Sequence, residues 1–317
     1  MSDHAEHSAP RHRHFAALLE RAKGMDPMPT TVIAPEETSS LGGALLARAH
    51  GLLEPILVGD PAKIHAAAET LGADLTGLEI VPEPDHKAAA LIAVRMVREG
   101  RASVVMKGHL HTDALLRAVL NKEVGLRTQR RLSHVFAIDV PGFDRLLMVT
   151  DGAINIAPDL KTKTDIAQSA IHLAHALGIE TPCLAALAAV ETVNPVMQPT
   201  VDAQALTEMA ASGAITGGLV DGPLAMDNAI DLRAAEIKGI VSEVAGRADI
   251  LLVPDIEAGN MVTKALTFAA AAQTGGLVLG AAAPVILTSR ADDDQARLAS
   301  AVLAVLDAAW RARLPKV

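Results

Sequence analysis

A cation and three anions follow a short apolar run near the C-terminal end of the chain. The stretch VILTSRADDDQARLA, residues 285–299, is apolar up to Thr288 and then places Ser289, Arg290 and the aspartates 292–294 side by side. A guanidinium binds phosphate or carboxylate through two parallel hydrogen bonds. A serine hydroxyl can donate to the same group, and an aspartate can move a proton. The aspartates could also simply cap a helix, so the stretch alone leaves both interpretations open.

Four further apolar runs end in polar residues that could meet a ligand. They end at Lys107-Gly108, Asp151-Gly152, Asp221-Gly222 and Asp255. Glycine beside such a residue permits a sharp turn or a close approach of the backbone to a ligand. Ligands of open parallel sheets bind at the carboxyl ends of strands, so these positions are candidates for substrate binding. Ordinary turns remain an alternative.

Positive charge is concentrated in one segment of an acidic chain. Residues 107–131 hold six basic residues against Asp113 and Glu123, a local charge of 6 − 2 = +4, whereas the whole chain carries −9 and the remainder therefore −13. The six are Lys107, Arg117, Lys122, Arg127, Arg130 and Arg131. This distribution favours a small anionic ligand, although a solvated helical face stays open. Net negative charge and 2% aromatic residues exclude a typical nucleic-acid surface.

The elements that must position these residues alternate along the chain. Short β-branched runs such as TTVIAP and SVVMKG alternate with helical periodicities, which predicts βαβ units and a parallel sheet. Residues 132–152 predict an antiparallel pair of strands around Pro141-Gly142. We expect an α/β protein with two α/β/α domains and a cleft between them. Domain I comprises residues 29–135 plus 290–317, domain II residues 136–289, and residues 1–28 form a flexible arm leading into a short helix. An eight-fold barrel is the alternative.

Composition limits the cellular setting. The single cysteine, Cys183, lies in an apolar run and predicts an inert thiol in a reducing compartment. No apolar stretch reaches the roughly 18 residues of a membrane helix, and no leader is visible at the N-terminus. We expect a cytoplasmic protein without a membrane or nucleic-acid partner.

Five long motifs resemble those of one enzyme family. They are MKGHLHTDALLRAVLNKEVGLRTQRRLSHV, MVTDGAINIAPDL, VDGPLAMDNA, LLVPDIEAGNMVTKAL and PVILTSRADDDQARL. Together they resemble the phosphate acetyl/butyryltransferases, over about residues 30–314, and details such as SRAD are closer to the butyryltransferase branch.

The resemblance implies a reaction, a fold and an assembly. The reaction is acyl-CoA + phosphate ⇌ acyl phosphate + CoA, by direct transfer in a ternary complex and without a metal or cofactor. The fold is that of isocitrate and isopropylmalate dehydrogenases, with the site between the domains. The assembly is a homodimer or a multiple of one.

The resemblance also implies roles for individual residues. Arg290 holds the phosphoryl group, Ser289 hydrogen-bonds the phosphate or the developing oxyanion, and Asp294 is the favoured general base. In the acetyl branch the base lies about seven residues after the serine, where this chain has Ala296. The expected substrate-binding residues are Lys107, Arg117, Arg131, Asp151, Asp221 and Asn260.

Two other functions stay open. A metal- and nicotinamide-dependent dehydrogenase of the same fold would use a tyrosine–lysine pair, but the chain has no tyrosine. The second is a relative that binds acyl-CoA without turnover, which would fit the presence of Ala296 where the acetyl branch has its base.

Overall fold

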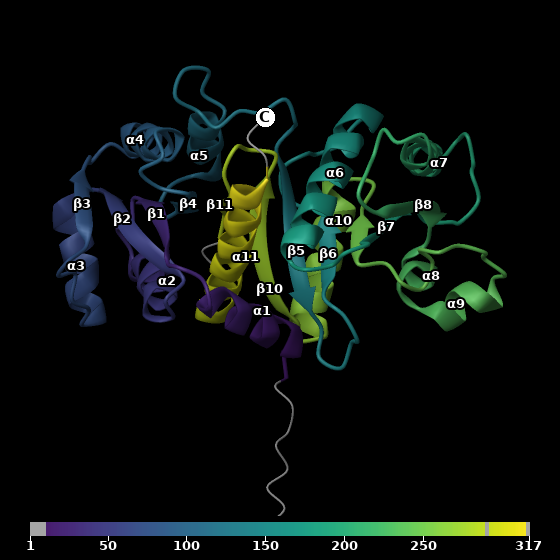
Figure 1. Ribbon diagram of the computed structural model, residues 1–317, viewed down its shortest axis with the longest axis horizontal. Helices are drawn as coiled ribbons and strands as arrows, with labels where there is room; N and C mark the ends of the chain where they lie inside the picture. The colour runs from purple at the N-terminus through teal and green to yellow at the C-terminus, as the bar shows by residue number, and fades with distance from the viewer. Residues whose placement is uncertain (1–10, 289–291, 315–317) are drawn as a thin grey trace, which may run out of the picture.

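One mixed β-sheet runs through the whole molecule. The computed structural model describes residues 11–288 and 292–314. Eleven strands form a single open sheet in the order β3-β2-β1-β4-β11-β10-β5-β6-β9-β7-β8, with helices on both faces (Figure 1). The predicted α/β class is confirmed, and the open sheet rules out the barrel.

The strands are short, and the helices that connect them vary in length. The strands are β1 (Met28–Ile33), β2 (Leu53–Gly59), β3 (Glu79–Pro82), β4 (Val104–Lys107), β5 (Ser133–Asp139), β6 (Leu147–Thr150), β7 (Cys183–Leu187), β8 (Leu219–Leu224), β9 (Ile250–Leu252), β10 (Gln273–Leu279) and β11 (Val285–Ile286). The helices are α1 (Arg13–Lys23), α2 (Thr38–Ala49), α3 (Pro61–Leu71), α4 (His86–Arg98), α5 (Thr112–Val119), α6 (Leu160–Ala176), α7 (Gln198–Ala211), α8 (Met226–Ile230), α9 (Leu232–Ile237), α10 (Ile256–Lys264), the π-helix η1 (Ala265–Ala269) and α11 (Asp294–Arg313). None of the described helices is long and apolar enough to cross a bilayer.

Local sequence explains several helix boundaries. The Asp60 carboxylate accepts from the Ala62 amide at the start of α3, with Pro61 in the first turn. Asp85 and Asp159 cap α4 and α6 in the same way. Gly72 ends α3 in the left-handed conformation at φ 62°. These aspartates therefore have a local structural role.

The sheet consists of two parallel halves of opposite direction. In the first half, β1, β2, β3, β4 and β11 are parallel; in the second half, β6, β7, β8 and β9 are parallel. Strand β10 is antiparallel to β11 and to β5, and β5 is antiparallel to β6, as the sequence predicted for that hairpin. The carboxyl ends of the strands in one half consequently lie at the opposite end of the sheet, along the strand direction, from those in the other half.

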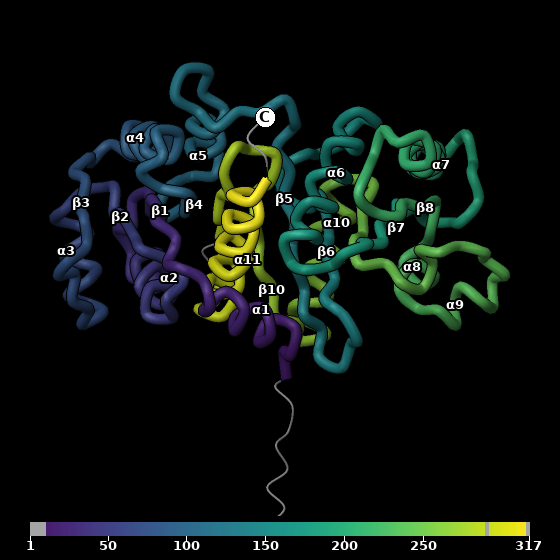
Figure 2. The backbone as a smooth tube through the Cα atoms, in the orientation of Figure 1, coloured from purple at the N-terminus to yellow at the C-terminus, as the bar shows by residue number. Residues whose placement is uncertain are grey.

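The chain leaves the first half and later returns to it. After β4 it builds the second half, and then β10, β11 and α11 bring it back beside β4 (Figure 2). This path agrees with a first half made from two separate segments, while the domain boundaries at 135/136 and 289/290 stay a prediction.

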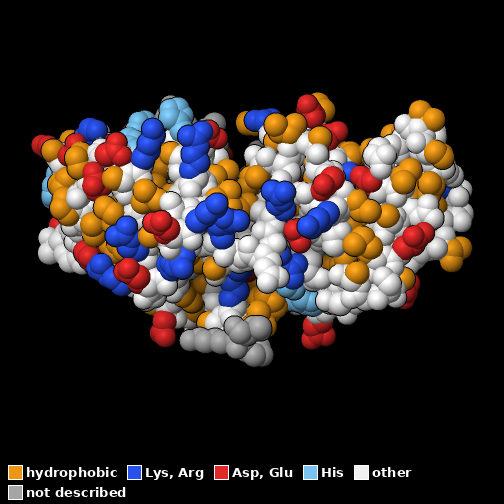
Figure 3. All heavy atoms as spheres, turned by 90° about the horizontal axis from the view of Figure 1, so that it is seen from above, with side chains coloured by type: hydrophobic (Ala, Val, Ile, Leu, Met, Phe, Trp, Pro, Cys, Tyr) orange, Lys and Arg blue, Asp and Glu red, His pale blue; other side chains and the backbone are white. Residues whose placement is uncertain are grey.

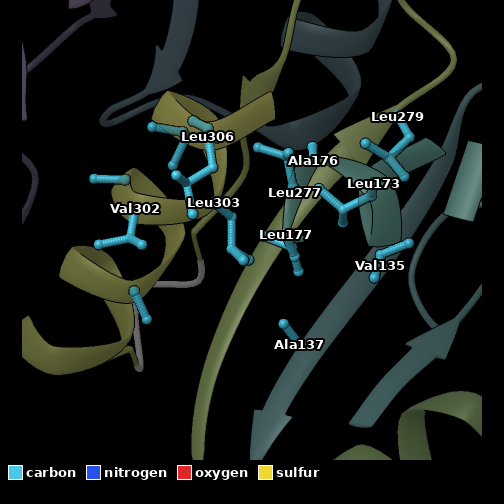
Figure 4. Close-up of a cluster of buried hydrophobic side chains, with 14 of the residues drawn as sticks. Val135, Ala137, Leu173, Ala176, Leu177, Leu277, Leu279, Val302, Leu303 and Leu306 are labelled. Atoms are coloured by element: carbon cyan, nitrogen blue, oxygen red, sulfur yellow. The ribbon is translucent and has the colours of Figure 1, made fainter. Parts of the chain in front are cut away.

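One face of the sheet is covered by a single continuous core. Helices α1, α2, α3, α6, α7 and α11 pack there on alternate residues of the strands. Figure 4 shows its centre, where α11 and α6 meet β10 and β5. The labelled side chains are Val135, Ala137, Leu173, Ala176, Leu177, Leu277, Leu279, Val302, Leu303 and Leu306.

The opposite face carries two separate cores. Helices α4 and α5 pack on the first half, around residues such as Val105 and Leu115. Helices α8, α9 and α10 pack on the second half, around residues such as Val149 and Leu251. On the central strands, Val278 of β10 belongs to the first of these cores and Ile138 of β5 to the second.

The described part of the predicted N-terminal arm contains a packed helix. The Asp139 carboxylate accepts from the amides of His14 and Phe15, and Phe15 is buried in the continuous core. Helix α1 is thus fastened to the end of β5.

A close approach of two backbones depends on Gly108. A Cβ at this position would overlap the carbonyl oxygens of Ile33 and Ala34, because the Ala34 oxygen accepts from the His109 amide at 2.7 Å. Gly108→Ala is expected to lower the free energy of unfolding by about 1–3 kcal/mol. Urea unfolding measures this value. Gly24→Ala, whose Cβ would meet only an oxygen at 3.5 Å, should change it little; equal effects of the two substitutions would contradict the interpretation.

Candidate active site

The reversal of strand direction separates the polar strand ends. Lys107 ends β4 beside Thr288, which follows β11, whereas Asp151, Asp221 and Asp255 follow or lie in strands of the opposite half. The polar strand ends therefore do not all lie at the same end of the sheet.

The alternation of side chains nevertheless brings several of these residues to the same face. Val105, Val278 and Val285 belong to the core under α4 and α5. Lys107 and Leu287, two residues after Val105 and Val285, therefore project from the same face, and so does His134, which pairs with Val278. Asp151 follows the end of β6, and its charge acts on His134.

Lys107 is buried and bound to the end of β11. The residue is 8% exposed, and its Nζ donates to the carbonyl oxygens of Gly108 and Thr288, both at 3.4 Å. On the other side of Thr288, the hydroxyl Oγ1 accepts from Arg297 at 3.2 Å. Two buried cationic side chains therefore converge on the residue that precedes Ser289.

A carboxylate–histidine network supports the loop after β4. Glu36 is buried and accepts from the Asp60 amide, from Lys63 and from His86. Burial raises the pKa of Glu36, but these hydrogen bonds outweigh burial and leave the pKa below its usual value. His109 lies 2.6 Å from the Glu37 carboxylate, with its ring against that of His86. The network fixes the segment next to Lys107.

His134 is a completely buried imidazole at the centre of the sheet. Its ring packs on Phe136 with centroids 4.3 Å apart and occupies the space that a Cβ on Gly276 would need, at 2.8 Å. Burial lowers the pKa of His134 to about 4, although the Asp151 charge and the Leu287 carbonyl raise it in part. The ring is therefore neutral at pH 7.

Asp151 organises the turn that follows β6. Its carboxylate accepts from the amides of Ala153, Ile154 and Asn155 and from the Asn155 side chain at 2.6 Å. The side chain of Asn155 also donates to the carbonyl oxygen of Leu132, the residue before the neighbouring strand β5. Asp151 thus holds a turn in place, and a role in binding substrate stays a prediction.

Asn260 lies beside this turn, whereas Asp221 lies far from it. Asn260 donates to the Gly152 carbonyl at 3.4 Å, and Gly152 touches Gly259 of α10. Asp255 caps α10 by accepting from the Ala258 amide. Asp221 lies in β8 at the far edge of the sheet, where it accepts from the Gly222 amide. The structure does not bring Asp221 to the other candidates.

Basic side chains line a pocket between the two halves. We call it the basic pocket; its volume is about 410 Å³, and α5, the segment 127–132, the turn after β6 and the start of α6 form it. Four cations and one carboxylate lie in its wall: Arg127, Arg130, Arg131, Lys161 and Asp165. Figure 3 shows Lys and Arg side chains on both sides of the midline, where the outline is notched. Arg131 is placed by its amide, which donates to Asp165 at 3.1 Å.

Arg117 and Asp294 are exposed. Arg117 pairs with Asp113 one turn earlier in α5 at 3.0 Å, and both side chains are more than three-quarters exposed. Asp293 caps α11 by accepting from the Ala296 amide, and Asp294 lies in the first turn. The capping role considered for the aspartates is thus filled by Asp293. Ser289 and Arg290 lie outside the described residues.

Three contributors were missed from the sequence. Arg297 and Lys161 looked like ordinary helix cations, and His134 like a residue of a strand. The available signal was position: His134 stands at an inward position among apolar residues, and Lys161 stands in the first turn of a helix. Only the fold brings Lys161 to the arginine-rich segment. Within residues 11–288 and 292–314, no group of three or more His, Cys, Asp and Glu is placed to hold a metal ion, and metal-independent exchange stays a prediction.

Comparison with known proteins identifies the family. The family described as phosphate acetyl/butaryl transferase matches residues 85–305. The phosphate acetyltransferase of Rhizobium meliloti is 53% identical over 94% of both chains. The phosphate butyryltransferase of Clostridium acetobutylicum is 44% identical over 92% of this chain and 97% of its own length. The chain belongs to the phosphate acetyl/butyryltransferase family.

Solved structures agree with this membership. The branched-chain phosphotransacylase of Enterococcus faecalis V583 superposes with a TM-score of 0.78 at 30% identity, over 89% of this chain and 99% of its own. The 4-hydroxythreonine-4-phosphate dehydrogenase of Klebsiella pneumoniae, at 12% identity and a TM-score of 0.55 over 89% of this chain and 100% of its own, shares the fold alone. The protein is an acyltransferase of this family, and the predicted dehydrogenase-like fold is confirmed. Relatives of both names match at similar identity, so a preference for the butyryl branch stays a prediction.

The buried His134 makes stability dependent on pH. Its native pKa of about 4 lies below the ordinary value of 6.5, so the unfolded chain binds more protons between these values, and stability falls as the pH drops through this range. The contribution lost between pH 7 and pH 4 is roughly 3 kcal/mol. Urea unfolding at both pH values should show a smaller loss for His134→Gln than for the wild type. Because the pKa of His172 is also lowered to about 4, the difference between the two proteins is the informative quantity. An NMR titration midpoint for His134 above pH 6 would contradict this account.

Proposed function

We propose that this acyltransferase exchanges CoA and inorganic phosphate on a short-chain acyl group by direct transfer in a ternary complex. What supports the proposal, beyond family membership, is the basic pocket between the halves of the sheet. CoA and phosphate are both polyanions, and a cluster of cations concentrates such ligands in a cleft. Arg131, predicted from the sequence as a ligand for these anions, is one of its lining residues.

The reaction requires stabilisation of negative charge. A phosphate oxygen attacks the carbonyl carbon of the thioester, and the tetrahedral intermediate carries an additional negative charge on the carbonyl oxygen. When the intermediate collapses, the C–S bond breaks, its electron pair goes to sulfur, and the thiolate takes a proton. Donors and cations aimed at the developing charge are commonly the largest catalytic contribution. We assign this role to Arg290 and Ser289 on the basis of the family resemblance, with Lys107 as a nearby cation.

The proton transfer needs an acid that becomes a base in the reverse direction. Asp294 is the candidate, as its place in the first turn of α11 leaves it exposed while Asp293 caps the helix. A thiol with an ordinary pKa near 8.5 is mostly protonated at pH 7, so attack of CoA on acyl phosphate benefits from a base.

A covalent acyl-enzyme is not needed for this chemistry. Cys183 begins β7, near the far edge of the sheet, and burial raises the pKa of its thiol. A thiol with a raised pKa is a poor nucleophile at neutral pH. The family chemistry, direct attack of phosphate on the thioester, therefore remains the simplest route, without a cofactor.

Release of CoA thiol from acyl-CoA tests the proposal. The wild type should release thiol from acetyl-, propionyl- or butyryl-CoA only when phosphate or arsenate is added. Ser289→Ala combined with Arg290→Ala should lower kcat/KM by more than about 100-fold, by analogy with the loss of oxyanion-hole donors. Arg131→Ala should mainly raise KM for acyl-CoA.

Arg233→Ala serves as the control, because Arg233 is an exposed cation of α9 in the second half. It should leave both constants unchanged. Thiol release without phosphate would indicate a thioesterase, and binding of acyl-CoA without any release would indicate a non-catalytic relative; either outcome contradicts the proposal.

We also propose that the protein forms a homodimer through the second half of the sheet. Large apolar side chains are exposed there, among them Ile237 (76%), Val241 (100%), Met261 (64%) and Phe268 (79%). Met261 lies in α10, and Phe268 lies in the π-helix η1 that continues it. Exposed apolar surface of this kind marks protein interfaces. We further propose that the protein is cytoplasmic, as its composition predicts.

Sedimentation velocity measures the assembly directly. The wild type should sediment as a dimer at micromolar concentration, and Phe268→Asp should shift it to the monomer because a charge would be buried in the interface. Leu71→Asp, at an exposed apolar position of α3 in the first half, should leave the dimer intact. A monomeric wild type, or equal effects of the two substitutions, would count against the proposed interface.

A further inference from the structure

Arg297 reaches from the covering helix α11 to the end of β11. The residue is 3% exposed, and its Nη1 donates to the Thr288 hydroxyl at 3.2 Å. Helix α11 belongs to the continuous core on one face of the sheet, whereas Lys107 projects from the other face and reaches the Thr288 carbonyl oxygen. Thr288 is therefore held from both faces by cationic side chains.

A glycine in α2 makes room for the Arg297 stem. A Cβ on Gly43 would lie 2.7 Å from Cδ of Arg297 and 3.4 Å from its Cβ. The neighbouring Gly42 faces Leu71 instead, and a Cβ there would make ordinary contact at 3.7 Å. Glycine in a helix interior is less favourable than alanine, so the space for Arg297 is kept at a loss of helix stability.

Arg297 is a buried cation in an apolar part of α11. Ala296, Leu298 and Ala301 of the same helix are buried apolar residues, and a methionine would fill a similar volume. Removing a guanidinium from water is costly even when it is paired, and apolar substitutes are often as stable. The charge and the donors of Arg297 therefore point to a function.

We propose that Arg297 is a positioning residue for the acyl-transfer reaction and acts through Thr288 to set the binding of inorganic phosphate. Thr288 is the residue before Ser289, and its hydroxyl and carbonyl oxygens are hydrogen-bonded from opposite faces of the sheet. This inference rests on the proposed exchange of CoA and phosphate. It differs from the roles given to Lys107 and Arg290, because we assign Arg297 an action through Thr288.

Steady-state kinetics with phosphate and acyl-CoA varied separately test this role. Arg297→Met should raise KM for phosphate about tenfold and lower kcat up to about 100-fold, as expected for a small misplacement of reacting groups, while KM for acyl-CoA changes less than about threefold. Arg297→Lys should recover part of the loss, because it retains the charge. Arg313→Met, an exposed residue at the end of the same helix, is the matched control and should behave as the wild type.

Two glycine variants separate the position of Arg297 from its charge. Gly43→Ala keeps every charge but displaces the stem, so KM for phosphate should rise, whereas Gly42→Ala should leave it unchanged. Thermal unfolding with and without inorganic phosphate shows whether each variant folds and binds, since a ligand of the native state raises its midpoint. Folded Arg297→Met that retains the wild-type KM for phosphate, or equal changes in both KM values, would overturn the inference. A wild type without phosphate-dependent thiol release would instead refute the proposed function.

Discussion

Three antiparallel pairings, β11 with β10, β10 with β5 and β5 with β6, separate the two parallel halves and determine which side chains of the molecule can meet. Because their number is odd, the two halves run in opposite directions. Lys107 and Thr288 therefore lie toward one end of the strands and the turn at Asp151 toward the other. The short length of β4 and β11 keeps these groups close to the centre of the sheet.

The two faces of the sheet differ in how their side chains pack. One face is sealed by a continuous apolar core that ties α11, α6 and α2 together. The other has two separate cores, and polar groups such as His134 and Lys107 occupy the strip between them. Lys107 is held there by carbonyl oxygens and Asp151 by backbone amides. Buried polar groups are tolerated when such partners satisfy them, so the strip can hold charge. Neither ring nitrogen of His134 has a hydrogen-bond partner among the described residues.

Local signals predicted the elements well, and long-range geometry poorly. The Asp60-Pro61 helix start, the Gly72 helix end and the antiparallel pair around Pro141-Gly142 depend on neighbouring residues and are all found. The basic segment likewise led to Arg131 and its pocket. The reversal between the halves combines the local β5–β6 hairpin with the pairing of β10 and β5, whose residues are more than 100 positions apart. Periodicity does not encode that long-range pairing. Asp221 was therefore grouped with residues from which it is remote. Arg297 was missed because a buried cation and a surface cation look alike in a helical pattern.

The return of the chain to its first half has a consequence for how the protein folds during synthesis. Strands β1 to β4 are complete after residue 107, but β11 and α11, which cover the exposed edge of β4 and one side of its core, lie beyond residue 284. An early half-sheet with an open edge is prone to pair with other chains, and contacts between distant segments form slowly. The nascent protein must therefore keep that edge protected for more than half of its translation, which makes it a natural client for chaperones.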